Sequence, residues 1–185
     1  MRNLIIACAL LAGCTTGDSG KTVDSAGGLT LDCATYCSTL TANCSAGNNQ
    51  FDTMADCLGS CAHYPMGTLA DMSGNTLGCR LNHASLAGGD PATHCIHAGP
   101  WGGDGVCGTA CEGFCSLVEA ECSTQYPAGS CAAECAGYTM TPDYSPTLTS
   151  GNTLACRMYH ATAASTDPAT HCVHTQMDTT GGPCQ

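Results

Sequence analysis

Cysteines and apolar residues recur at helical spacing in the first half of the chain. From Cys33 to Cys44 they lie at positions i, i+4, i+7 and i+11, with Leu40 as the third member, which places all four on one helix face. The same spacing returns between residues 111 and 122, with Val118 in place of the leucine. We therefore predict one amphipathic helix in each of these two segments.

Helix-start signals predict two more helices after each of these segments. A helix should begin at Asn75-Thr76 and another at Asn152-Thr153, because a Thr side chain can cap the first free amides. Asp90-Pro91 and Asp167-Pro168 combine a capping carboxylate with proline at the first helical position, so each should begin a further short helix. Few segments alternate as strands do, and we predict a small, mainly α, disulfide-rich fold.

The chain contains an internal duplication. Each of the eight cysteines from Cys33 to Cys107 has a counterpart 74 to 78 residues later, and residues 74–97 match residues 151–174 at 16 of 24 positions. This repeated cysteine spacing predicts two tandem repeats of a four-disulfide helical domain. The predicted domains are a signal peptide at 1–13, a lipidated cysteine with a flexible tether at 14–31, and cysteine-rich repeats at 32–109 and 110–185.

The composition indicates that disulfide bonds hold this fold together. The 185 residues include 18 cysteines but few of the large aliphatic residues that build an ordinary core. Burial alone could not offset the conformational entropy of such a chain, whereas each cross-link contributes roughly 2–4 kcal/mol. Pairing of this extent needs an oxidising compartment outside the cytoplasm.

Two C-x3-C segments in each repeat predict part of the disulfide pattern. Cysteines four residues apart lie one above the other on a helix, so two such helices lying antiparallel can be joined by two bridges. The spacing is similar to that of twin C-x3-C helical hairpins in other proteins. The predicted pairs are Cys33–Cys61, Cys37–Cys57, Cys111–Cys135 and Cys115–Cys131. The other cysteines should pair within their own repeat, and they are Cys44, Cys79, Cys95 and Cys107, then Cys122, Cys156, Cys172 and Cys184.

The chain is strongly acidic. Four Lys and Arg residues stand against 15 Asp and Glu, which gives a formal net charge of −11. Nucleic-acid binding requires clustered positive charge, so we exclude nucleic acid as a partner. The sequence has no nucleotide-binding loop, no serine-hydrolase motif and no haem-attachment motif, and we predict that the protein is not an enzyme.

The first residues resemble a bacterial lipoprotein signal. A positive Arg2 precedes the apolar run Leu4–Leu11, which is too short to span a bilayer. The string Leu11-Ala12-Gly13-Cys14 then resembles a lipobox, although an ordinary secretory signal with a coincidental cysteine is the alternative. The lipobox resemblance implies a lipid on Cys14, which makes the membrane a partner. It also implies a place in the bacterial cell envelope, where Thr15 favours the outer membrane.

The repeated histidines are the candidate ligands for a metal ion. Each repeat has the pattern C-x3-H-x10-H-C-x-H, and histidines three residues apart on one short helix can face one ligand. A third histidine from a neighbouring helix could complete a site for Cu or Zn. Under the structural alternative the histidines hydrogen-bond helix ends, and no cofactor is required. The candidate metal ligands are His83, His94 and His97, then His160, His171 and His174.

Two arginines, Arg80 and Arg157, occupy equivalent positions in the duplication. We expect them to pair with Asp90 and Asp167, or with carbonyl groups at helix ends, rather than to bind an anion. They therefore enter the prediction as structural residues.

The repeats also resemble a bacterial family. The strings G-N-T-L-x-C-R-x-x-H-A and D-P-A-T-H-C-x-H are similar to cysteine-rich lipoproteins of myxobacteria, for which no activity is established. The first copy continues as Ala98-Gly99-Pro100 as in that family, whereas the second departs at Thr175. We therefore predict a lipid-anchored, non-enzymatic cell-envelope protein that displays two rigid modules for an unknown protein or surface partner. The alternative is a lipoprotein that binds Cu or Zn through three histidines in each repeat.

Overall fold

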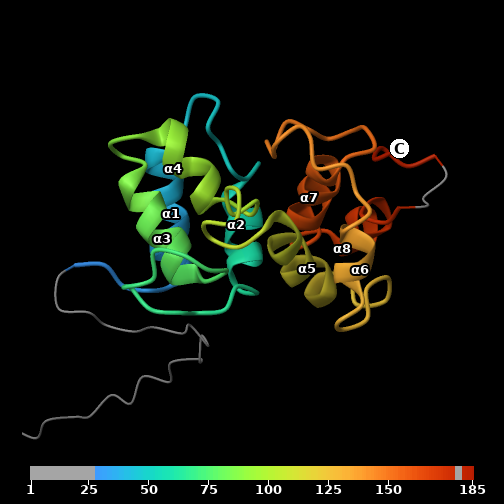
Figure 1. The fold of residues 1–185 in the computed structure, drawn as a ribbon, viewed down its shortest axis with the longest axis horizontal. Helices are drawn as coiled ribbons and strands as arrows, with labels where there is room; N and C mark the ends of the chain where they lie inside the picture. The colour runs from blue at the N-terminus through green and yellow to red at the C-terminus, as the bar shows by residue number, and fades with distance from the viewer. Residues whose placement is uncertain (1–27, 178–180) are drawn as a thin grey trace, which may run out of the picture.

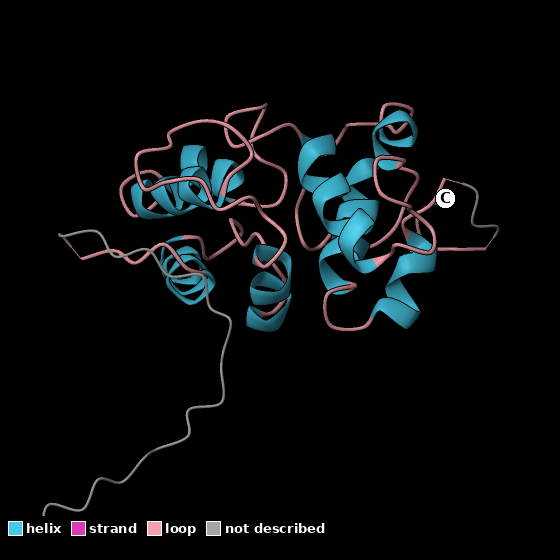
Figure 2. Cartoon of the chain, turned by 90° about the horizontal axis from the view of Figure 1, so that it is seen from below, coloured by secondary structure: helices cyan, strands magenta, loops and turns pink. Residues whose placement is uncertain are grey.

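The part of the chain that the structure describes is built from helices. This computed structural model describes residues 28–177 and 181–185 (Figure 1). Its helices are α1 (Cys33–Asn43), α2 (Met54–Cys61), α3 (Leu77–Leu86), α4 (Pro91–Ala98), α5 (Ala110–Glu121), α6 (Cys131–Cys135), α7 (Leu154–Ala163), α8 (Pro168–His171) and the 3-10 helix η1 (Cys172–His174). An isolated antiparallel bridge joins Gly105 and Gly108, and no strand forms in these ranges (Figure 2). The predicted small, mainly helical, disulfide-rich fold is confirmed.

Polar caps start the later helices of each half where the sequence predicts them. Thr76 and Thr153 each accept a hydrogen bond from the amide three residues further on, and they begin α3 and α7. Asp90 and Asp167 do the same for α4 and α8, and each is followed by proline at the first helical position. These caps satisfy amides that have no partner inside the helix, and so fix where each helix begins.

Eight disulfides link the helices, four in each half of the chain. The bridges between α1 and α2 are Cys33–Cys61 and Cys37–Cys57, and those between α5 and α6 are Cys111–Cys135 and Cys115–Cys131. These are the four pairs expected from the spacing. The other bridges are Cys44–Cys95, Cys79–Cys107, Cys122–Cys172 and Cys156–Cys184. Counterpart cysteines therefore pair in the same order in both halves.

Two buried arginines lie at equivalent places in the core. Arg80 and Arg157 are both fully buried, which is unusual for a charged side chain. The Arg80 guanidinium lies 4.0 Å from the centre of the Tyr64 ring, and that of Arg157 lies 4.3 Å from the Tyr138 ring. Each cation therefore has the face of an aromatic ring as a partner.

The same guanidinium groups also bind backbone carbonyls. Nε of Arg80 donates to the carbonyl of Gly99 at 3.3 Å, and Nη2 of Arg157 donates to the carbonyl of Cys184 at 2.9 Å. The expected pairing with Asp90 and Asp167 is wrong, because these carboxylates accept backbone amides at the starts of α4 and α8. The arginines instead donate to backbone carbonyl groups, which was the other expectation.

The two halves pack against each other through α2 and α7 (Figure 1). Trp101 of the first half stacks on Tyr144 of the second, with ring centres 6.4 Å apart and planes 15° apart. The hydroxyl of Thr166 donates to the buried carboxylate of Asp56 at 2.9 Å. Both apolar and polar contacts therefore hold the two halves together.

The predictions for the N-terminal segment fall mostly outside the described residues. The proposed signal peptide and Cys14 lie there. Leu31, the last residue of the predicted tether, is 1% exposed and packs in the core. Within the described ranges, no helix has the length and apolar character needed to cross a membrane.

Candidate metal centre

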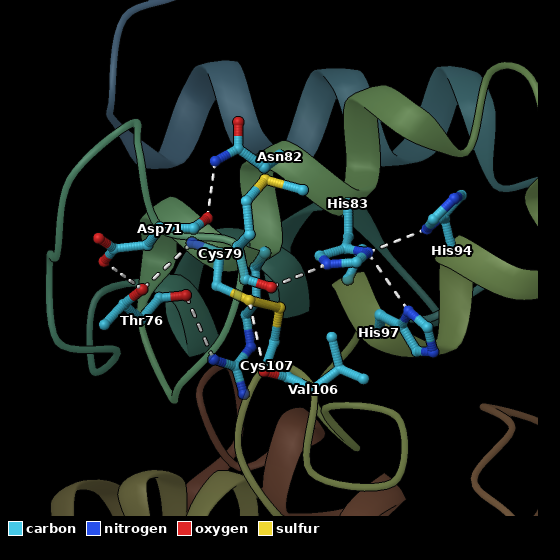
Figure 3. Close-up of a disulfide and its surroundings, with 12 residues drawn as sticks. Asp71, Thr76, Cys79, Asn82, His83, His94, His97, Val106 and Cys107 are labelled. Atoms are coloured by element: carbon cyan, nitrogen blue, oxygen red, sulfur yellow. Dashed lines mark hydrogen bonds between the residues drawn. A yellow bond between two sulfur atoms is a disulfide. The ribbon is translucent and has the colours of Figure 1, made fainter.

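Three histidines of the first half meet between α3 and α4. His83 lies on α3, one turn after Cys79, whose disulfide to Cys107 anchors that part of the helix (Figure 3). His94 and His97 lie one turn apart on α4. The helical spacing directs both α4 histidines to the same side, where α3 packs against α4.

The imidazole nitrogens of these residues converge. Nδ1 of His83 lies 3.0 Å from Nδ1 of His94 and 3.3 Å from Nδ1 of His97 (Figure 3). The three ring centres are 4.9 to 5.8 Å apart. His83 is 5% exposed, and the other two are half-buried. The cluster therefore has one buried nitrogen and two that reach the surface.

A backbone carbonyl determines which nitrogen of His83 carries the hydrogen. Nε2 of His83 lies 3.3 Å from the carbonyl oxygen of Met72, which can only accept a hydrogen bond. Neutral His83 therefore keeps its hydrogen on Nε2 and its lone pair on Nδ1, directed at His94 and His97. A histidine whose second nitrogen donates to a carbonyl is typical of metal sites, because this contact fixes the ligand nitrogen and the ring orientation.

The second half contains a related but less regular cluster. Nδ1 of His160, on α7, lies 2.8 Å from Nδ1 of His171 at the end of α8. His174 lies on η1, with its ring centre 4.7 Å from that of His160 and a 74° angle between the planes. Nδ1 of His174 is buried and has no hydrogen-bond partner among the described residues. Each of the three residues still offers a nitrogen within 4.8 Å of the others, but no hydrogen bond joins His174 to the other two.

Burial lowers the pKa of four of these histidines, His83, His97, His160 and His174. Desolvation lowers the pKa of His83 and, with smaller repulsion from His83 and His94, also that of His97. Desolvation, followed by repulsion from His174 and then His171, lowers the pKa of His160 to about 4. Near neutral pH the buried members therefore keep the lone pairs that a metal ion requires.

The first cluster fits a tetrahedral or similar divalent ion. Zn–N distances of about 2.0–2.1 Å at tetrahedral angles place two ligand nitrogens roughly 3.3 Å apart. The Nδ1 atoms lie 3.0 and 3.3 Å from that of His83, so small movements would accommodate an ion. Imidazole suits both Zn and Cu. Three protein ligands would leave a fourth position for an exogenous ligand.

Two parts of this site were not found from the sequence. The Met72 carbonyl is a backbone group and leaves no residue pattern to detect. Gly103, with φ of 58°, lies so close to His97 that a Cβ there would be 2.1 Å from His97 Cδ2. Residues 99–105 are rich in glycine, but the sequence does not show that this loop packs over the histidine. That loop closes one side of the cluster.

Fold and clusters together define a small, disulfide-bonded helical protein with a three-histidine cluster in each half. A family model described as the BfoA family C-terminal domain matches residues 19–111, half of the chain. The chain therefore belongs to this family. The matched range contains the complete first cluster, with His83, His94 and His97.

Similar proteins are found in fungi. The chain is 38% identical over 88 residues to the Aurasperone B biosynthesis cluster protein A of Aspergillus niger, covering 46% of this chain and 29% of that protein. It is 36% identical over 88 residues to the Bifonsecin B biosynthesis cluster protein A of Aspergillus brasiliensis, with 46% and 30% covered. The chain thus spans about three tenths of the length of these relatives. No solved structure matches the chain.

These relatives correct the predicted identity. The resemblance to myxobacterial lipoproteins is wrong, because the chain matches the BfoA family and its curated relatives are proteins of Aspergillus. The lipid-anchored bacterial envelope protein, its outer-membrane location and the metal-binding lipoprotein are therefore wrong as well. The error arose because the lipobox and the two repeat strings are short, whereas the fungal alignments extend over 88 residues.

Proposed function

We propose that this protein binds divalent copper or zinc, without catalysing a reaction, at two three-histidine sites, one in each half. One observation carries the proposal. The Nδ1 atoms of His94 and His97 lie 3.0 and 3.3 Å from Nδ1 of His83, whose other nitrogen faces a backbone carbonyl. Histidines that only hydrogen-bond helix ends would direct these nitrogens at carbonyl groups instead. The proposal depends on neither a lipid anchor nor a bacterial source.

The rest of the molecule supports this function. Its net charge of −11 raises the local concentration of cations near the surface. Disulfides hold both helices of the first site, because Cys79 is bridged from α3 and Cys95 from α4. Ligands on helices that are fixed in this way are held in place before an ion arrives, which lowers the cost of ordering them.

The names of the relatives suggest a setting. They describe proteins of the aurasperone B and bifonsecin B biosynthesis clusters. From these names we infer only that the present chain also serves a biosynthetic pathway, as an accessory protein that holds metal. Its acidic surface supports a partner other than nucleic acid.

Metal content measured by elemental mass spectrometry tests the proposal. The disulfide-bonded chain, purified without a histidine tag, would be dialysed against Zn²⁺ or Cu²⁺ and then against buffer. We expect two retained ions per chain, one for each cluster. The double variant His94→Ala/His97→Ala should retain one, and adding His171→Ala/His174→Ala should remove the other.

His63 supplies the matched control, since it belongs to neither cluster and instead contacts Glu121 at 2.5 Å. The variant His63→Ala should retain both ions. Full retention after loss of His94 and His97, or no retention by the unmodified chain, would overturn the proposed function.

A further inference from the structure

A disulfide lies beside the buried histidine of each cluster. Cys79, His83 and Cys107 each offer a ligand atom within 4.8 Å of the others, and Cys156 and Cys184 do the same with His160. Figure 3 shows the first of these disulfides next to the His83 ring, which also faces His94 and His97. His83 therefore belongs to two different sets of candidate ligands.

We infer that reduction of the Cys79–Cys107 disulfide converts the three-nitrogen site into a second metal site, formed by His83 and two thiolates. This inference rests on the proposed function, because it uses the same histidine. The counterpart set in the second half would behave alike. Two thiolates with one imidazole are a ligand set suited to Zn²⁺ or Cu⁺.

The helix places the first thiolate correctly. Cys79 and His83 lie four residues apart on α3, so their side chains share one face and can bind one ion. The capping Thr76, which accepts the Cys79 amide at 3.1 Å, fixes the turn that carries the cysteine. Cys107 arrives from the loop after α4, where an isolated bridge between Gly105 and Gly108 folds the chain back. The ligand directions therefore come from the backbone and not from the disulfide alone.

The two ligand sets exclude each other. A neutral imidazole has one hydrogen and one lone pair, so His83 can bind only one ion at a time. Three neutral imidazoles leave a divalent ion with its full charge, whereas two thiolates neutralise it. Cys79 and Cys107 are 0% exposed, and a buried ion is far less costly when its charge is neutralised. The reduced set should therefore bind a divalent ion more tightly than the oxidised set.

The redox step is a thiol–disulfide exchange. Two molecules of a low-molecular-weight thiol reduce the Cys79–Cys107 bond, giving two cysteine thiols and one small-molecule disulfide. The ion then displaces one proton from each thiol, and both protons pass to solvent. Apart from the counterpart Cys156–Cys184, which has His160, the other bridges lack this partner, because no histidine of the described residues forms such a group with them. Metal should therefore favour reduction of Cys79–Cys107 and of its counterpart Cys156–Cys184 over the other six bridges.

A single substitution isolates the thiolate. The variant Cys107→Ser leaves the Cys79 thiol beside His83, and the control Cys61→Ser leaves the Cys33 thiol on α1, outside every candidate ligand group. Each variant loses one bridge. With Co²⁺ as the probe, we expect a thiolate-to-cobalt charge-transfer band in Cys107→Ser. The band should be absent from Cys61→Ser and from the oxidised unmodified chain.

The same titration separates the two proposals. Cobalt bound to the oxidised chain without a charge-transfer band, followed by no band in Cys107→Ser, would overturn the second ligand set and leave the proposed function intact. No cobalt bound to the oxidised chain would overturn the proposed function itself. The band should persist when His94→Ala/His97→Ala is added to Cys107→Ser, because those histidines belong only to the oxidised set.

A second measurement uses the unmodified chain, in case Cys107→Ser fails to fold. The chain would be equilibrated in glutathione redox buffers with and without Zn²⁺, quenched in acid, alkylated and mapped by mass spectrometry. If the reduced set binds Zn²⁺ 100-fold more tightly, the midpoint for Cys79–Cys107 should become less negative by about 59 mV. The midpoint for Cys33–Cys61 should not change. Equal midpoints with and without Zn²⁺ would overturn the inference.

Discussion

The two halves share one disulfide pattern but differ at the helix that carries two of the three histidines. In the first half, α4 continues to Ala98, whose carbonyl accepts one hydrogen bond, from the Tyr36 hydroxyl at 2.7 Å. In the second half, α8 ends at His171 and a 3-10 turn follows. The Thr175 carbonyl there accepts from two hydroxyls, those of Tyr126 and Tyr138, at 2.8 and 3.1 Å.

This difference accompanies a difference in contacts: Nδ1 of His97 lies 3.3 Å from Nδ1 of His83, whereas Nδ1 of His174 has no hydrogen-bond partner among the described residues. Thr175 is fully buried, and its own hydroxyl donates to the carbonyl of Cys172 at 2.7 Å, which tightens the last turn. A tighter turn rotates the residue three positions after His171 away from the α-helical direction. The comparison teaches that cysteine spacing fixes which helices meet, whereas contacts at a helix end fix where its last side chains lie.

Removing the long-range bridge of either half would test how far the shared pattern controls stability. The Cys44–Cys95 and Cys122–Cys172 bridges close loops of 51 and 50 residues. We expect Cys44→Ser/Cys95→Ser and Cys122→Ser/Cys172→Ser each to lower the free energy of unfolding by about 4 kcal/mol. Unfolding in guanidinium chloride would measure this. Costs that differ greatly between the halves would contradict the view that the two bridges are equivalent.

Acid should destabilise the second half more than the first. The unfolded chain binds a proton at His160 with an ordinary pKa near 6.5, whereas the folded chain does so only near pH 4. The stability present above pH 6.5 should therefore fall as the pH drops toward 4, by up to about 3 kcal/mol, and then level off. Urea unfolding across this range would measure the slope.

A matched pair of variants would show which histidine causes this pH dependence. His160→Gln should flatten the dependence of stability on pH more than His83→Gln does. The reason is that folding lowers the pKa of His160 more than that of His83. An unchanged slope in His160→Gln would show that another group titrates.

Metal affinity should also differ between the halves, in favour of the first. The variant His171→Ala/His174→Ala retains only the first site, and His94→Ala/His97→Ala retains only the second. We expect the first site to bind Zn²⁺ about tenfold more tightly, roughly 1.4 kcal/mol, because His97 already lies within hydrogen-bond distance of His83, whereas no such contact holds His174. Competition with a chromogenic chelator would measure both dissociation constants. Tighter binding at the second site would contradict the geometric comparison.

Several features of the fold followed from local sequence, each for a physical reason. Cysteines four residues apart define a helix face, so the α1–α2 and α5–α6 hairpins were predictable. The capping residues Thr76 and Asp90 marked the starts of α3 and α4, because a cap acts on amides of its own turn. The pairing of the remaining cysteines depends on how α3 and α4 pack, and residue spacing does not contain that information.

The candidate site was predictable only in its residue types. The repeated histidines identified which side chains to examine, but convergence on Nδ1 depends on the Met72 carbonyl, a main-chain group 11 residues from His83. The Arg80 environment could not be predicted either, since its partners are a carbonyl and the ring of Tyr64, whereas charge pairing suggested Asp90. The source of the protein was predicted wrongly from the four-residue lipobox and two short repeat strings.

The stacking of Trp101 on Tyr144 gives the molecule its own optical reporter. Trp101 is the single tryptophan of the chain, is 4% exposed, and belongs to the first half while its stacking partner belongs to the second. Its fluorescence will therefore respond when the halves separate, even if each remains folded internally. A shift of tryptophan emission at a lower denaturant concentration than the loss of helical circular dichroism would mark that separation as its own step.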